Sequence, residues 1–174
     1  MGAATCQAQI GTGASVSWAN AEGGICFDLA DSATDTTTPI QIPTTTGTNF
    51  SWIKNLVLAV TATGTTAITN RRVSQSGAAS TGLALFWKDV AQASYAQAAT
   101  GNRPTASGSN GATPSGYTAM TTTPAQYDNT SHATSATGPN GDMAVCVLGV
   151  DNTFAGGPGS ATSLPSIIIT YDEA

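Results

Sequence analysis

Two stretches decide the fold, FSWIKNLVLAVT (residues 50–61) and LALFWKDV (residues 83–90). Successive side chains of a β-strand point to opposite faces, so the spacing of apolar residues indicates which face meets the core. The even positions of the first stretch are Phe50, Trp52, Lys54, Leu56, Leu58 and Val60. Lys54 is the one exception on this predicted core face. With AITNRRVSQS (residues 67–76) between them, the two stretches predict three strands in the middle of a β-sandwich.

The second face of these strands is also apolar. Ile53 and Val57 lie on the odd face of the first stretch, and DMAVCVLGV (residues 142–150) is apolar on both faces. A free antiparallel sandwich has one dry and one wet face per strand, so these outer faces need a cover. The cover is either the chain's own long loop or a neighbouring subunit. The candidate partner interface consists of Ile53, Val57, Phe86, Val90, Tyr95 and Tyr117.

The remaining strand candidates complete an all-β fold. ASVSWAN (residues 14–20) and ICFDL (residues 25–29) predict a first hairpin, PIQIP (residues 39–43) predicts a sheet edge, and residues 167–171 predict a closing strand. The total of about eight candidates fits a single domain over residues 1–174. We expect a two-sheet antiparallel sandwich, either jelly-roll or immunoglobulin-like.

Two segments fall outside this strand pattern. Residues 1–13 form a predicted N-terminal arm that is either free or inserted into a neighbour. Residues 92–141 form a long low-complexity loop rich in Ala, Thr, Ser, Gly, Asn and Pro. Because a structureless loop of this length is rare in a compact domain, we expect short strands around residues 117–120 and 124–127. Residues 101–115 should form an exposed excursion, and one helical turn is expected between Trp87 and Gln97.

Charged residues make up only 9% of the chain, and the formal net charge is −5. A surplus of negative charge opposes binding to nucleic acid or to an anionic membrane. Arg71 and Arg72, the one adjacent basic pair, should point to opposite faces of a strand and make no phosphate-binding stripe. No apolar run is long enough to cross a bilayer, and the first residues do not resemble a secretory signal. We expect neither nucleic acid nor membrane as a partner.

The three cysteines, Cys6, Cys26 and Cys146, allow one disulfide at most, and their spacing does not choose a pair. Cys26 and Cys146 stand in apolar segments, where a free thiol behaves as a small hydrophobic group. This favours assembly in a reducing cytoplasm.

No catalytic, metal or cofactor motif is present. His132 has Ser131 beside it and Asp128 nearby, but without a nucleophile elbow we expect an exposed loop histidine. The acidic residues Asp28, Asp31 and Asp35 lack the spacing of a calcium loop and predict solvated turns. Gly11–Gly13 and Gly156–Gly159 also predict turns, and the glycosylation sequons at Asn49 and Asn129 are chance matches.

The aromatic residues leave two interpretations open. Trp52 and Trp87 lie on apolar alternating faces and predict core packing, whereas Trp18 could belong to a sugar-binding platform. The tyrosines of the long loop fit a partner contact and simple packing over the sheet equally well.

The arrangement FSWIKNLVLAVT, ITNRRV, TGLALFWKDV and the closing PSIIITYDEA resembles small virion structural proteins of tailed bacteriophages, especially head decoration or cement proteins. This resemblance implies a non-enzymatic β-sandwich on the outer capsid surface, often a trimer, that contacts the major capsid protein and copies of itself. It supplies no active-site residue. The alternatives are a tail component and a glycan-binding β-sandwich for host attachment.

Overall fold

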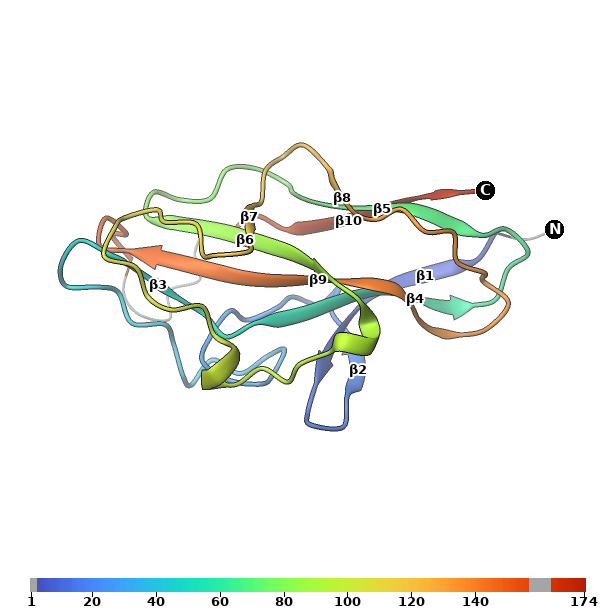
Figure 1. Ribbon diagram of the computed structural model, residues 1–174, viewed down its shortest axis with the longest axis horizontal. Helices are drawn as coiled ribbons and strands as arrows, with labels where there is room; N and C mark the ends of the chain where they lie inside the picture. Colours follow the sequence, from blue (N-terminus) through green and yellow to red (C-terminus); the bar gives the residue numbers. More distant parts are fainter. Residues whose placement is uncertain (1–2, 157–163) are drawn as a thin grey trace.

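The computed structural model describes residues 3–156 and 164–174, and its strands form two antiparallel sheets (Figure 1). The larger sheet contains β1 (Thr5–Thr12), β2 (Ser17–Asn20), β3 (Thr48–Phe50), β4 (Lys54–Ala62), β6 (Leu83–Val90), β7 (Thr118–Ala119) and β9 (Gly138–Asp151). The smaller sheet contains β5 (Ile68–Gln75), β8 (Ala125–Asp128) and β10 (Ile167–Glu173). The 3₁₀ turns η1 (Gln92–Ser94) and η2 (Thr100–Asn102) belong to the segment after β6.

The strand order of the larger sheet is β2-β1-β4-β9-β6-β7, and β3 pairs with the C-terminal end of β9. The smaller sheet has the order β10-β5-β8. These pairings confirm the predicted all-β, two-sheet antiparallel sandwich, while the jelly-roll and immunoglobulin-like topologies stay predictions. No described helix is long and apolar enough to cross a membrane.

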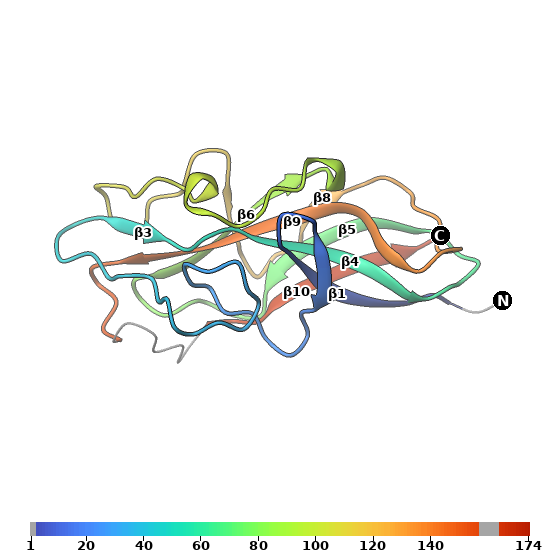
Figure 2. The same cartoon turned by 90° about the horizontal axis from the view of Figure 1, so that it is seen from below.

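The main core lies between the two sheets. It joins Leu56, Leu85 and Cys146 of the larger sheet to Val73 and Tyr127 of the smaller one. The loop between β2 and β3 closes the same core where the smaller sheet ends, and it contributes the buried Ile40. Figure 2 shows this loop on one side of β9 and the segment with η1 and η2 on the other.

A second core, which we call the outer core, lies on the face of the larger sheet that is turned away from the smaller sheet. Ile53, Val57 and Phe86 are buried there against Met143, Val145 and Val147, and the covering residues come from the chain itself. Tyr95, Ala96, Ala98 and Tyr117 of the segment after β6 pack on this face. Of the two covers that the sequence allowed, the structure contains the chain's own loop. We call residues 91–117 the outer layer.

The outer layer and the following segment have the expected secondary structure. The predicted short strands are present as β7 and β8, and the predicted helical turn is present as η1. Residues 101–115 are mostly exposed, as predicted, but they are anchored, because Ser107 pairs with Thr48 and Pro114 is buried. The predicted turn at residues 156–159 lies mostly outside the described residues.

The N-terminal predictions are wrong, except for the strand expected within residues 14–20, which is present as β2. Residues 5–12 are strand β1, which pairs with β2 on one side and β4 on the other, so they form no free arm. The first hairpin joins β1 to β2, and residues 25–29 and 39–43 contain no strand. The sequence TCQAQIGT has little hydrophobic signal, yet its backbone pairs with two neighbours and Ile10 is fully buried. Backbone pairing, rather than apolar content, makes this strand.

The prediction of one continuous strand with Phe50 and Leu56 on one face is also wrong. Phe50 pairs with Gly149 and Lys54 with Cys146, so residues 51–53 lie opposite only residues 147–148. This extra residue is a β-bulge, and a shift of one residue moves a side chain to the other face. Phe50 therefore packs in the outer core, where its ring centroid lies 6.0 Å from that of Phe86.

Candidate functional site

The six predicted interface residues separate into two groups. Ile53, Val57 and Phe86 are core residues of the single chain and are not part of its surface. Val90, Tyr95 and Tyr117 are half-buried at the margin of the outer core. The correction follows from the outer layer, which covers the apolar face that the sequence pattern left open.

Lys54 is buried and neutralised inside the chain. Its Nζ donates to Asp28 Oδ1 at 2.8 Å and to the carbonyl oxygens of Ala30 and Ser32 at 2.9 and 2.7 Å. An ammonium group has three protons, so all three donors have a partner. The loop between β2 and β3 thus closes over Lys54, which explains how a charge can stand on a core face.

The acidic residues of this loop serve the fold. Asp31 accepts hydrogen bonds from Gly13 N and Gln97 Nε2, both at 2.8 Å, and Asp35 accepts two from Thr37. Within residues 3–156 and 164–174, no group of three His, Cys, Asp or Glu side chains is arranged to hold a metal ion. Asp35 has the predicted turn role, whereas the prediction of a solvated Asp28 is wrong, because Asp28 is buried and pairs with Lys54.

A second buried ion pair lies within the smaller sheet, between β5 and β8, and is hydrogen-bonded to β9 of the larger sheet. Arg71 is fully buried, and its guanidinium donates to Asp128 Oδ2 at 2.7 Å and to Asn140 Oδ1. The backbone N–H groups of Asp142 and Thr130 also donate to Asp128. Arg72 points the other way and pairs with Asp172 at 2.8 Å near the surface, so the two adjacent arginines lie on opposite faces as predicted.

His132 is not the exposed loop residue that we expected. It is half-buried and exchanges two backbone hydrogen bonds with Ile68, each 2.9 Å long. Its Nε2 lies 3.0 Å from Asp128 Oδ2, an ion-pair distance without hydrogen-bond geometry. Because Arg71 and two backbone groups already use the Asp128 carboxylate, we assign Asp128 and His132 a structural role.

Burial acts to raise the pKa of Asp128. The backbone hydrogen bonds from Asp142 and Thr130 and the charges of Arg71 and His132 outweigh burial, and the pKa is lowered. The carboxylate is therefore ionised across the neutral range. This state matches the fully buried guanidinium opposite it.

The cysteines and tryptophans are mainly structural. All three cysteines are free, and burial raises the pKa of Cys146 to about 12. Trp87 is in the main core, as predicted, whereas Trp52 is half-buried against the outer core. Trp18 packs edge-on against Tyr95 at 6.0 Å between ring centroids. Trp18 therefore packs against the outer layer and does not form an open platform.

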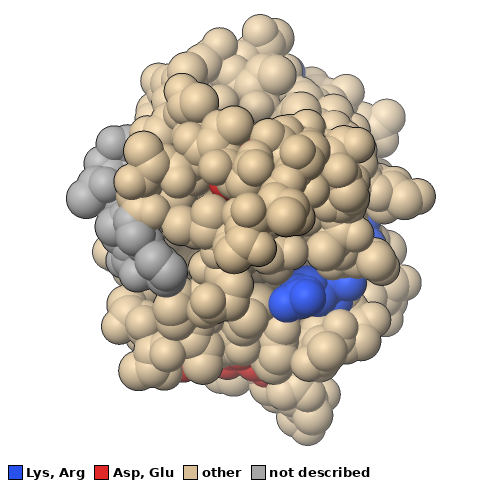
Figure 3. Space-filling model, turned by 90° about the vertical axis from the view of Figure 1, so that its left-hand side faces the viewer, with Lys and Arg blue, Asp and Glu red and all other residues tan. Residues whose placement is uncertain are grey.

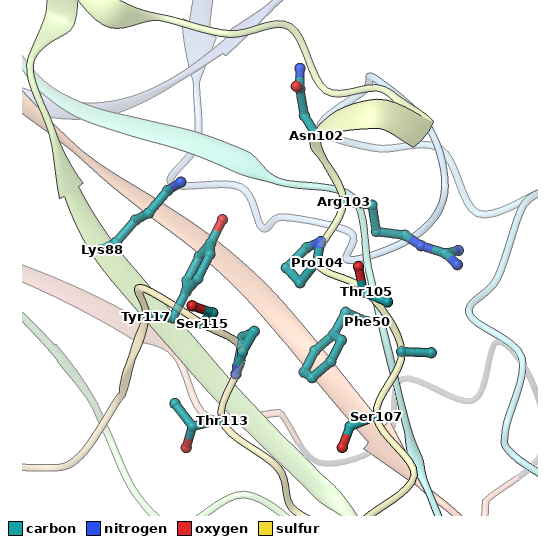
Figure 4. Close-up of a pocket in the computed structure, with 12 residues that line it drawn as sticks. Phe50, Lys88, Asn102, Arg103, Pro104, Thr105, Ser107, Thr113, Ser115 and Tyr117 are labelled. Carbon is teal, nitrogen blue, oxygen red and sulfur yellow. The ribbon is translucent and has the colours of Figure 1, made fainter.

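A hollow of about 490 Å³ lies in the outer layer and is a candidate ligand site (Figure 4). Its wall comes from residues 102–107 and 113–117, with Phe50 and Lys88 contributed by β3 and β6. Lys88 Nζ lies 4.8 Å from the centre of the Tyr117 ring. The hollow also includes Arg103, so it contains two of the chain's five basic residues.

Of the residues that line this hollow, the sequence patterns indicated Tyr117 as a candidate partner contact and Phe50 as a core residue. Lys88 appeared as an ordinary polar position of a strand, and Arg103 as part of a low-complexity loop. The signal that could have found the site is the scarcity of positive charge. In a chain with five basic residues, each one that lacks a nearby acidic partner is informative.

Comparison with known protein families, with curated proteins and with solved structures found no match. The class that the fold defines is an antiparallel β-sandwich whose larger sheet has an additional layer of loop on its outer face.

Proposed function

We propose that this protein is a virion structural protein, a non-enzymatic capsid decoration protein located on the outer surface of the head. Its partners are the major capsid protein and copies of itself, in a trimer. The sequence resemblance of residues 50–90 and 164–174 motivates this proposal, and one feature of the surface carries it.

That feature is the free edge of β10. This strand pairs with β5 on one side, and no described strand pairs with it on the other. Ile168, the second residue of β10, is one of the two large hydrophobic residues that are exposed in the described chain, at 38%. A free edge presents unpaired N–H and C=O groups, and natural proteins usually protect such edges with charge, proline or a cover. An apolar edge strand suits β-strand pairing with another subunit.

The low surface charge supports the same proposal. Figure 3 shows a face that is almost entirely uncharged, apart from one prominent basic patch. Many copies packed on a shell repel one another less when each has few charges. Lys54 and Arg71 are buried with their carboxylate partners, which removes these charges from the surface.

The test compares Ile168→Lys with Val16→Lys. Val16 is the other exposed large hydrophobic residue, at 39%, but it lies in the turn between β1 and β2. The purified proteins are added to empty heads assembled without the protein, and bound copies and the temperature of shell disruption are measured. We expect the natural chain and Val16→Lys to bind and to raise that temperature, whereas Ile168→Lys does neither.

Self-association is measured by sedimentation on the same three proteins. The natural chain and Val16→Lys should form the trimer, and Ile168→Lys should remain monomeric. A natural chain that is monomeric at all concentrations and leaves the shells unchanged would contradict the proposed function.

A further inference from the structure

The five basic residues of the chain divide according to their partners. Lys54, Arg71 and Arg72 each form an ion pair with an aspartate, at 2.7–2.8 Å. Lys88 and Arg103 have no carboxylate within ion-pair distance among residues 3–156 and 164–174. Both line the outer-layer hollow. The chain has ten acidic residues and a net charge of −5. The hollow is nevertheless locally positive, because these two unpaired basic side chains line it.

The lining is otherwise rich in groups that form hydrogen bonds. Its hydroxyl and amide side chains are Asn102, Thr105, Ser107, Thr113 and Ser115. Burial raises the pKa of Tyr117 to about 12, so its hydroxyl is protonated at neutral pH and can donate a hydrogen bond. Pro104 and the Tyr117 ring supply accessible apolar surface between these polar groups, whereas Phe50 and Pro114 are buried. Polar groups around an apolar floor are typical of small-ligand sites.

The wall of the hollow is anchored before any ligand binds. Ser107 and Thr48 exchange two backbone hydrogen bonds of 2.9 Å, and Asn110 Oδ1 accepts one from Gly47 N at 2.8 Å. Asn102 Nδ2 donates to the carbonyl oxygen of Gln97 at 2.6 Å. Because the wall is already ordered, less conformational entropy is lost when a ligand binds.

The positions of the two cations indicate the size of the ligand. Figure 4 shows Lys88 beside Tyr117 on one side of the hollow and Arg103 on the other, with its guanidinium directed away from Lys88. The two charged groups therefore do not converge on one small anion such as a phosphate. A longer molecule with acidic groups and many hydroxyls can reach both and also use the polar lining.

We propose that the outer-layer hollow binds an acidic oligosaccharide, with Lys88 and Arg103 each meeting an acidic group of the sugar chain. The hydroxyl and amide side chains bind sugar hydroxyls, and the proline and aromatic surfaces contact the apolar faces of the rings. An acidic peptide is the less suitable ligand, because the hollow lies away from the free edge of β10 and offers hydroxyl groups in place of apolar pockets for side chains. This site goes beyond the proposed capsid role and does not depend on it.

The test is a titration of the full chain, by calorimetry or by NMR chemical shifts, with defined probes. The probes are tetragalacturonate, sialyllactose, a sulfated heparin tetrasaccharide, neutral cellotetraose and hexaglutamate. We expect binding of at least one acidic oligosaccharide that weakens as salt is added, and no binding of cellotetraose. The first three probes distinguish uronate, sialate and sulfate as the source of the acidic group.

Three variants locate the binding. Lys88→Gln and Arg103→Gln should each weaken the acidic oligosaccharide about tenfold or more, as expected for loss of a hydrogen bond to a charged group. Arg72→Gln is the matched control, because it removes a basic residue from the smaller sheet, where Arg72 pairs with Asp172, and should leave the affinity unchanged. Thermal unfolding of each variant checks that it is folded.

Several outcomes would overturn the site. They are no binding of any acidic oligosaccharide at millimolar concentration, binding of hexaglutamate as tight as that of the acidic oligosaccharide, and affinities of Lys88→Gln and Arg103→Gln equal to that of the natural chain. The shell assay with Ile168→Lys is independent of these measurements, so failure of one proposal is distinguishable from failure of the other.

Discussion

At the scale of single residues, Lys54 shows how a charge can occupy a core face when the fold supplies its partners. The periodicity of residues 50–61 identified Lys54 as an exception, but nothing in the sequence identified Asp28 as its counterion. The two residues are 26 positions apart, and Asp28 lies in a loop without periodicity. Sequence patterns report which face a side chain takes, whereas a long-range ion pair depends on loop packing.

We predict that Lys54→Met lowers the free energy of unfolding by about 3–5 kcal/mol, because it leaves the buried Asp28 carboxylate without a counterion. Urea unfolding at neutral pH measures the change. The control is the double variant Lys54→Met, Asp28→Asn, which removes both charges. It should be more stable than Lys54→Met alone, and the reverse order would show that the ion pair has no such role.

The pKa of Asp128 predicts how stability depends on pH. Its pKa is lowered in the folded chain from the usual value of 3.8. Its contribution to stability is therefore complete above that value and is lost as the pH falls through the lower, folded pKa. We expect the free energy of unfolding to decrease below about pH 4 as this carboxylate is protonated.

NMR titration of the aspartate carboxyl groups tests this directly. The hydrogen bonds from Arg72 and Asn70 lower the pKa of the half-buried Asp172 to about 2, so Asp172 also contributes to the pH dependence. Asp172→Asn removes that second contribution, and the acid loss of stability should persist in it. Titration of Asp128 at or above 3.8 would contradict the prediction.

At the scale of elements, the central strands of the larger sheet were predictable from the sequence, but the irregularities within them were not. Residues 83–90 and 142–150 have the predicted faces, because regular strands obey a period of two. The bulge at residues 51–53 interrupts this period without a distinctive residue, so Phe50 was placed on the wrong face. β1 was missed for another reason, since its few apolar residues conceal a strand that two neighbours pair with.

The start of β9 depends on Gly141, which has φ +81°. A Cβ at this position would collide with the Asp128 carboxylate and the Arg71 guanidinium. Gly116 has a similar φ of +77°, but a Cβ there would meet no atom within 4 Å. These two glycines separate the cost of the backbone conformation from the cost of the contact.

We predict that Gly116→Ala costs about 1–2 kcal/mol for its left-handed backbone. Gly141→Ala should cost about 1–3 kcal/mol more, because the buried ion pair must move. The free energies of unfolding in urea measure both changes. Equal losses in the two variants would mean that the ion pair accommodates the extra methyl group without strain.

At the scale of the whole molecule, the class of fold was predictable and the hollow was not. Apolar strands and Gly, Pro and Thr turns are local properties, and they sufficed for an antiparallel sandwich. The hollow combines Phe50 and Lys88 with two separate parts of the outer layer, and its character depends on which basic residues remain without an acidic partner. Which basic residues lack an acidic partner is visible only in the folded chain. The smaller sheet covers one apolar face of the larger sheet and the outer layer covers the other, so neither face needs a second subunit.

The global stability of the molecule can be followed through its three thiols. Cys146 is fully buried in the central strand β9, whereas Cys6 and Cys26 are half-buried. Its thiol pKa of about 12 further suppresses the reactive thiolate. We predict that iodoacetamide labels Cys146 in the native protein only through global unfolding, so that its labelling rate rises with urea with the full slope of the equilibrium transition.

Mass spectrometry of timed samples measures this rate, and Cys6 and Cys26 serve as internal controls that react through smaller openings. Because all three thiols are free, a reducing agent should leave the unfolding temperature unchanged. Labelling of Cys146 as fast as Cys26, independent of urea, would mean that the two sheets separate without unfolding. The main core would then not hold the sandwich together as one cooperative unit, because β9 is the strand on which both the main core and the outer core are built.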